Sequence, residues 1–139
     1  MRKIIKRSLL TALGVAAMAG LSAAPANAAG HDVYVAYSYP ADDSNCESGG
    51  AIGFASYGDD ISVSDTCADG HSAIGVVNVG SSFYYYWNHD GAGSTREVNL
   101  NFREGQPLAI RSCLGEWKGT ATGGIMWSTC GHINANVTA

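Results

Sequence analysis

The chain has 139 residues, of which 14% are charged, and its twelve acidic residues outnumber its eight lysines and arginines. That length suits a single domain with one modest hydrophobic core. The acidic balance argues against proteins that hold nucleic acid or anionic lipid by charge, because such proteins need cations to displace counterions.

The first 28 residues have the three parts of a secretory signal peptide. Four basic residues fall within the first seven positions, the apolar run Leu9–Leu21 follows, and Ala26-Asn27-Ala28 is a small-residue cleavage site. The apolar run is too short to span a bilayer. We therefore predict cleavage after Ala28, a secreted protein with no membrane attachment in its mature form, and one domain over residues 29–139. Cleavage leaves four basic against twelve acidic residues, a formal charge of −8.

Alternation of apolar and polar residues dominates the rest of the chain, and turn residues separate the alternating segments. In the clearest segment, Val98, Leu100 and Phe102 face a core. The predicted strands cover residues 33–39, 51–57, 61–65, 72–79, 83–88, 96–103, 108–114 and 124–130. About eight short strands at this spacing are typical of a sandwich. We predict an all-β fold, a small jelly-roll-like or Greek-key β-sandwich, with a loosely held tail from about His132.

Four cysteines in an exported chain predict two disulfides. Cys113 and Cys130 lie equally far from the midpoint of a turn region at Gly119–Gly124, and Cys46 and Cys67 flank a second hairpin turn. Hairpin geometry thus favours the pairs Cys46–Cys67 and Cys113–Cys130. In the chain-entropy model each bridge stabilises the fold by about 3 kcal/mol.

No combination of residues indicates catalysis or a bound cofactor. His71 and Ser72 are adjacent, and neighbouring strand residues point to opposite faces, so they cannot form a nucleophile–base pair. Neither a metal-binding cysteine or histidine spacing nor a G-x-S-x-G motif occurs. The acidic residues from Asp59 to Asp69 indicate solvated turns, and calcium binding there stays open. We expect a protein that is not an enzyme, with no cofactor and no predicted metal ligands.

The run from Phe83 to Trp87 is aromatic at every position. If its odd-numbered residues pack inward, Tyr84 and Tyr86 point outward beside Asn88. Rigid rings with polar tips suit sugar C–H groups or a protein surface. The strand therefore predicts a binding site at Tyr84, Tyr86 and Asn88, and the alternative is a strand covered on both sides.

The segment between Cys113 and Cys130 is a second candidate surface. It carries Trp117 next to Lys118, the only lysine of the mature chain. A bridge at its base would preorganise the loop, as substrate-like protease inhibition requires. Its glycines count against that role because binding would have to remove their freedom. The other interpretation is a plain hairpin loop whose Trp117 folds over the core.

Several short motifs resemble a widespread type of small exported actinobacterial protein. They are residues 65–72 (DTCADGHS), 88–93 (NHDGAG), 104–105 (EG) and 111–113 (RSC). Such proteins have a signal peptide and a short β-rich domain with a D-T-x-A-D-G-H turn. A cysteine often precedes their Asp-Thr pair, whereas Ser64 stands there in this chain and Cys67 lies inside the motif. The resemblance implies an exported compartment and a β-rich fold, and it implies no activity.

These patterns lead to two functional hypotheses. The first is a secreted, non-catalytic binding module that takes a carbohydrate, a cell-wall polymer or a secreted protein through the aromatic strand. The alternative is a proteinaceous inhibitor of extracellular proteases that acts through the Cys113–Cys130 loop.

Overall fold

The computed structural model describes residues 32–41 and 44–139, so the predicted signal peptide lies outside the described residues. Those residues form nine strands and one short 3-10 helix, η1 (Trp127–Thr129). The strands are β1 (Val33–Tyr37), β2 (Gly50–Ala55), β3 (Asp60–Asp65), β4 (Ser72–Val79), β5 (Ser82–Asn88), β6 (Thr95–Asn99), β7 (Pro107–Gly115), β8 (Ile125–Met126) and β9 (Asn134–Thr138). In this part of the chain no helix is long and apolar enough to cross a membrane.

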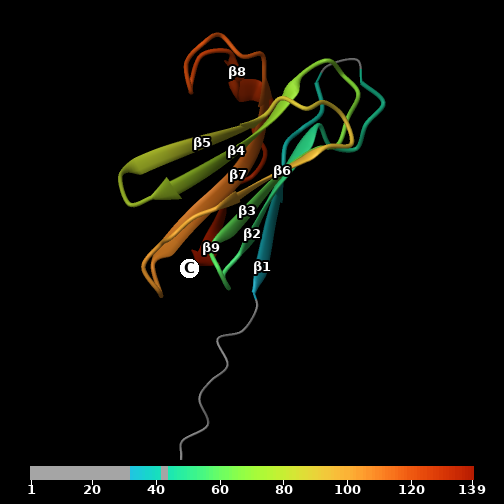
Figure 1. The fold of residues 1–139 in the computed structure, drawn as a ribbon. Coiled ribbons are helices and arrows are strands. Elements are labelled where there is room, and N and C mark those ends of the chain that lie inside the picture. The colour runs from blue at the N-terminus through green and yellow to red at the C-terminus, as the bar shows by residue number, and fades with distance from the viewer. Residues whose placement is uncertain (1–31, 42–43) are drawn as a thin grey trace, which may run out of the picture.

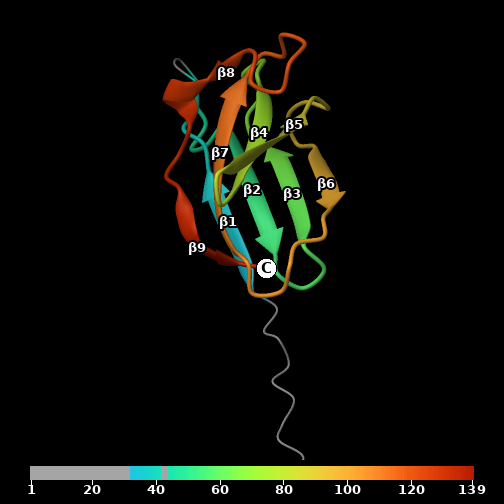
Figure 2. The same ribbon diagram turned by 90° about the vertical axis from the view of Figure 1, so that its left-hand side faces the viewer.

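The strands form two antiparallel sheets that pack face to face (Figure 1, Figure 2). The β1 sheet has the order β1-β2-β3-β6. The β4 sheet has the order β5-β4-β7-β8, and β9 also pairs with β7. The chain passes between the sheets after β3, after β5 and after β6. The prediction of an all-β, disulfide-stapled sandwich is confirmed.

The core lies between the sheets, because every second side chain of each central strand points into that space. Its fully buried members are Ile52, Phe54, Ile61 and Val63 from the β1 sheet and Ala73, Val77, Ile110 and Leu114 from the β4 sheet. The sheets approach closely at Gly75, where an added Cβ would lie 2.7 Å from Val63 Cγ2. Leu100 and Phe102 pack partly against this core, as predicted, although β6 already ends at Asn99.

Both predicted disulfides are present. Cys46 and Cys67 lie just beyond the open end of the β2–β3 hairpin, as the hairpin argument requires. The second bridge is not a simple cross-strand pair. The predicted strand over residues 124–130 contributes only the two residues of β8, and η1 then brings Cys130 back to Cys113 of β7.

The prediction of a loose tail from His132 is wrong. Asn134–Thr138 form β9, which pairs with β7 and buries Val137 opposite Leu108. Ala139 extends the pairing, because its N–H donates to the Gln106 carbonyl (3.1 Å). The sequence of β9 has a single large apolar residue, so its alternation is too weak to reveal a strand whose partner is distant in the chain.

Candidate functional site

Strand β5 does not present the predicted site, because Asn88 is fully buried. Its side-chain Nδ2 donates to the carbonyls of Val63 (3.0 Å) and Ser94 (3.1 Å). Its Oδ1 accepts the Asp90 N–H (3.0 Å) and the Ser94 hydroxyl (3.1 Å). Asn88 therefore fixes the connection between β5 and β6 and is not available to a ligand.

The prediction that the odd-numbered residues of the aromatic strand pack inward is also wrong. Tyr86 packs against the core between the sheets and is half-buried, while Trp87 lies on the other face beneath the Cys113–Cys130 loop. Burial raises the pKa of the Tyr86 phenol, and the neighbouring Tyr84 adds to this effect while Arg96 opposes it. Because both faces of β5 are aromatic, alternation alone could not decide which face meets the core. Of the predicted site, only Tyr84 is exposed (45%).

The Cys113–Cys130 loop is held against β5. Trp87 donates from Nε1 to the Ala121 carbonyl (2.8 Å), and the Trp117 ring packs edge-on against Trp87 with centroids 5.2 Å apart. Lys118 extends into solvent and lies 3.4 Å from Glu116 Oε2. The structure thus brings Trp117 back onto the domain, as one interpretation of the sequence held, and leaves the Lys118 side chain 64% exposed.

His71 and Ser72 do not pair with each other. The Ser72 hydroxyl lies 3.4 Å from His89 Nδ1, and His71 Nδ1 lies 3.7 Å from Glu116 Oε1. Within the described residues no carboxylate is hydrogen-bonded to His89, whose ring stacks on Trp87. The exposed Ser72–His89 contact therefore lacks the third group that orients the base in a catalytic triad.

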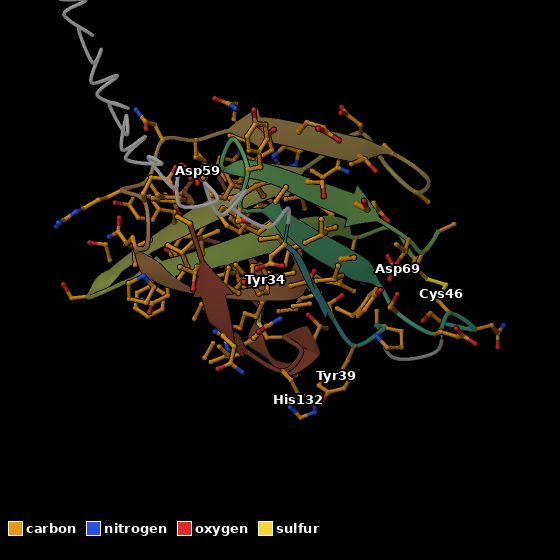
Figure 3. The ribbon with its side chains drawn as sticks, turned by 90° about the horizontal axis from the view of Figure 1, so that it is seen from below. Tyr34, Tyr39, Cys46, Asp59, Asp69 and His132 are labelled. Carbon is orange, nitrogen blue, oxygen red and sulfur yellow. A yellow bond between two sulfur atoms is a disulfide. The ribbon has the colours of Figure 1, made fainter. Side chains whose placement is uncertain are left out.

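The acidic residues considered for calcium are divided between the two ends of β3. Figure 3 shows Asp59 and Asp69 far apart. Asp59 is buried and accepts the Phe102 N–H (2.7 Å), and Asp69 Oδ1 accepts the His71 N–H (3.0 Å). Burial raises the pKa of the Asp65 carboxyl, while the Cys67 N–H lowers it and the Asp69 charge raises it further. Over residues 32–41 and 44–139, no three His, Cys, Asp or Glu side chains are placed to hold a metal ion.

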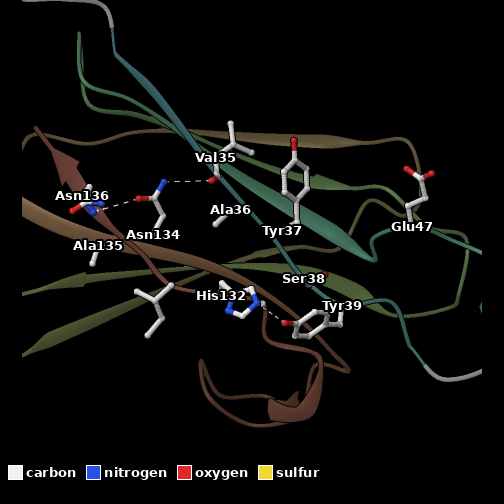
Figure 4. A pocket seen from close by; sticks show the side chains of 12 residues that line it. Val35, Ala36, Tyr37, Ser38, Tyr39, Glu47, His132, Asn134, Ala135 and Asn136 are labelled. Carbon is white, nitrogen blue, oxygen red and sulfur yellow. Dashed lines mark hydrogen bonds between the residues drawn. The ribbon is translucent and has the colours of Figure 1, made fainter.

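A groove of about 530 Å³ lies between β1 and the segment leading into β9 (Figure 4). Two tyrosine rings flank it, Tyr37 (58% exposed) and Tyr39 (48% exposed). Its polar lining comes from Glu47, His132, Asn134 and Asn136. Sequence reasoning missed this site because the tail was not expected to fold. The available signal was the alternation of tyrosines from Tyr37 to Tyr39, directly before Pro40.

The walls of the groove are joined by direct contacts. The Tyr39 hydroxyl lies 3.0 Å from His132 Nε2, so this contact joins one wall to the other (Figure 3, Figure 4). Asn134 Nδ2 reaches the Val35 carbonyl across the groove (3.5 Å). The Tyr39 N–H donates to the Thr129 carbonyl (2.8 Å). These contacts preorganise the site before any ligand arrives.

A second depression of about 240 Å³ lies on the outer face of the β4 sheet, lined mainly by Val76, Phe83, Ala109 and Arg111. Ile133, which is 60% exposed, lines both depressions. The groove has the features of a binding site, since aromatic walls carry a few convergent polar groups within a preformed depression.

Comparison with known proteins found no relative of this chain. No protein-family model matches the chain, and no curated protein and no solved structure was found to match it. The resemblance to small exported actinobacterial proteins therefore stays a prediction.

Proposed function

We propose that this protein is a secreted, non-catalytic module that binds an extracellular polysaccharide in the groove between β1 and β9. The observation that carries the proposal is the pair of exposed rings, Tyr37 and Tyr39, which line the same groove as the side-chain amides of Asn134 and Asn136. The electron-rich faces of aromatic rings attract the C–H groups of sugars, and amides exchange hydrogen bonds with hydroxyls. Both requirements of sugar binding are thus present within one groove.

Charge and compartment support an extracellular, uncharged ligand. The acidic residues of the mature chain repel phosphate-rich and other anionic polymers. Two disulfides are compatible with an oxidising compartment outside the cytoplasm. Neutral polysaccharides such as chitin and cellulose are therefore the first ligands to test, with peptidoglycan and secreted proteins after them.

The test is co-sedimentation of oxidised protein (residues 29–139) with chitin, cellulose and peptidoglycan, and in parallel with a culture filtrate. Retention by at least one polymer is expected. Tyr39→Ala should weaken it about tenfold or more, the effect of losing one well-packed aromatic contact. Tyr57→Ala is the matched control, since Tyr57 is also exposed (68%) but lies in the turn between β2 and β3. Absence of retention by every polymer, or equal binding by Tyr39→Ala, would contradict the proposal.

Inhibition of a protease is the second candidate function. It is favoured by the exposure of Lys118 on a loop fixed by Trp87 Nε1 and by the bond from the Glu116 N–H to the Gly124 carbonyl (3.0 Å). The check is a trypsin assay with the parent and Lys118→Ala. Inhibition by the parent that disappears in the variant supports this function, and rapid cleavage after Lys118 rules it out.

A further inference from the structure

The outer edge of β5 carries backbone groups with no partner in the described structure. Val79 and Ser82 close the two-residue turn of the β4–β5 hairpin, so the even-numbered residues of β5 direct their N–H and C=O groups toward β4. The odd-numbered residues must then point away. An independent contact agrees, because Arg96 Nη1 donates to the Trp87 carbonyl from the outer side (2.6 Å). The N–H and C=O groups of Phe83 and Tyr85 stay open.

The edges of the β1 sheet are protected in ways that β5 is not. The Val35 carbonyl of β1 and the N–H of Tyr39, two residues beyond that strand, are bonded to Asn134 and Thr129. On β6, which has five residues, Arg96 and Glu97 place charges on the strand. Charged residues, short strands and covering segments are the common means by which proteins block pairing between sheet edges. Strand β5 has seven residues, none of them charged or proline.

The hairpin that carries β5 is also free of charge and reaches beyond its neighbours. From Ser72 to Asn88 the chain has no acidic or basic residue, although the mature chain carries an excess of acidic residues overall. Figure 1 shows the tip of the β4–β5 hairpin extending away from the β1 sheet. Two copies of an acidic protein repel each other over most of their surfaces. This hairpin is a place where they can meet without opposing like charges.

We propose that two copies of this chain pair through β5, antiparallel, about a twofold axis at Tyr84. In that register Phe83 of each copy lies opposite Tyr85 of the other, and each such pair exchanges two backbone hydrogen bonds. All four open groups of each copy are then satisfied. The same register places Phe83 and Tyr85 rings side by side on one face, an aromatic cross-strand pair that stabilises antiparallel strands. A twofold, self-complementary contact of this kind closes at the dimer.

The dimer leaves the β1–β9 groove open, because β1 lies at the edge of the other sheet. Each dimer would then carry two grooves, and a polymer that spans both would be held more tightly than by one. This consequence rests on the proposed function, whereas the pairing itself does not.

The pairing is tested by sedimentation velocity of oxidised protein (residues 29–139) over a concentration series, without any polymer. A concentration-dependent dimer is expected. Phe83→Pro removes one outward N–H and an exposed ring while leaving the bonds to β4 in place, and should raise the dimer dissociation constant about tenfold or more. Val33→Pro is the matched control on the exposed edge of β1 and should leave the dimer unchanged.

Tyr84→Lys provides a second variant, because it sets two like charges on the proposed axis and keeps the backbone intact. This variant should likewise raise the dimer dissociation constant, and its melting temperature should stay close to that of the parent. A parent that is monomeric up to about 1 mM, the range of very weak association, would overturn the proposal. So would a dimer that neither variant weakens, because it must form elsewhere.

Discussion

Strands β1 and β5 are both tyrosine-rich and both lie at the edge of a sheet, but their outer edges are covered to different extents. Residues 129–134 cover the outer edge of β1 and the residues just after it, where they bond the Val35 carbonyl and the Tyr39 N–H. Among residues 32–41 and 44–139, the outer edge of β5 is covered only at the Trp87 carbonyl. One tyrosine-rich edge thus forms the wall of a groove, and the other stays open to pairing. The difference comes from the segments that lie beside the strands.

The strongest test of this contrast removes the disulfide that holds the covering segment. Cys113→Ala with Cys130→Ala should lower the free energy of unfolding by about 3 kcal/mol, because the bridge constrains the unfolded chain. The Cys46–Cys67 bridge closes a loop of similar length. Its removal in the double variant Cys46→Ala, Cys67→Ala should therefore lower the free energy of unfolding by a similar amount. Urea denaturation measures both losses.

The two cysteine pairs should differ in ligand binding below the unfolding transition. Loss of Cys113–Cys130 leaves Thr129 and Gly131 joined to β7 by hydrogen bonds alone and should loosen the wall of the groove, whereas Cys46–Cys67 lies elsewhere. Binding to the retained polymer should fall in that variant and persist in the other. Equal loss of binding in both would show that the groove responds to overall stability alone.

Asn88→Ala should destabilise the domain by about 2–4 kcal/mol, because it removes four hydrogen bonds from a fully buried site and orphans their backbone partners. Thermal denaturation measures the loss. Polymer binding at a temperature where the variant is folded should equal that of the parent. A stable variant with impaired binding would restore Asn88 to the ligand site.

Gly131 allows the covering segment to reach β1. An added Cβ would collide with the Tyr37 carbonyl oxygen, which belongs to the backbone and cannot rotate aside. Gly131→Ala should therefore cost about 1–3 kcal/mol, typical of overpacking, and weaken polymer binding. In Gly53→Ala the new methyl group would meet the Ser62 hydroxyl, which can turn away, so this control should be milder.

The smallest expected effect concerns Tyr86, the half-buried tyrosine of β5. Its phenol has a pKa raised above the ordinary 10.0, so the folded protein keeps that proton at a pH where the unfolded chain has lost it. Stability is therefore unaffected below pH 10.0 and falls as the pH rises from there through the folded-state pKa. Tyr86→Phe should reduce this alkaline loss, measured by urea denaturation at several pH values. An unchanged slope would contradict the assignment.

Much of the fold could be predicted because the signals are local. The alternation of β2, β3 and β4, and the cysteines flanking a hairpin, are encoded in neighbouring residues. The facing of β5 could not be predicted, since Tyr85 and Tyr86 are equally suited to a core and only pairing with β4 assigns them. The groove could not be predicted either. Its second wall, from Gly131 to Asn136, is placed by pairing with the distant strand β7 and by a glycine whose close approach to Tyr37 leaves no trace in the sequence.

The central claim is that the groove between β1 and β9 binds sugar. The most direct measurement is a titration of isotope-labelled protein (residues 29–139) with soluble chitin and cellulose oligosaccharides, followed by two-dimensional amide NMR. The account predicts shifts that saturate with one of these ligands and cluster at Tyr37, Tyr39 and residues 131–136. Shifts centred on residues 83–87 or on Lys118, or no saturable shift with either oligosaccharide, would contradict it.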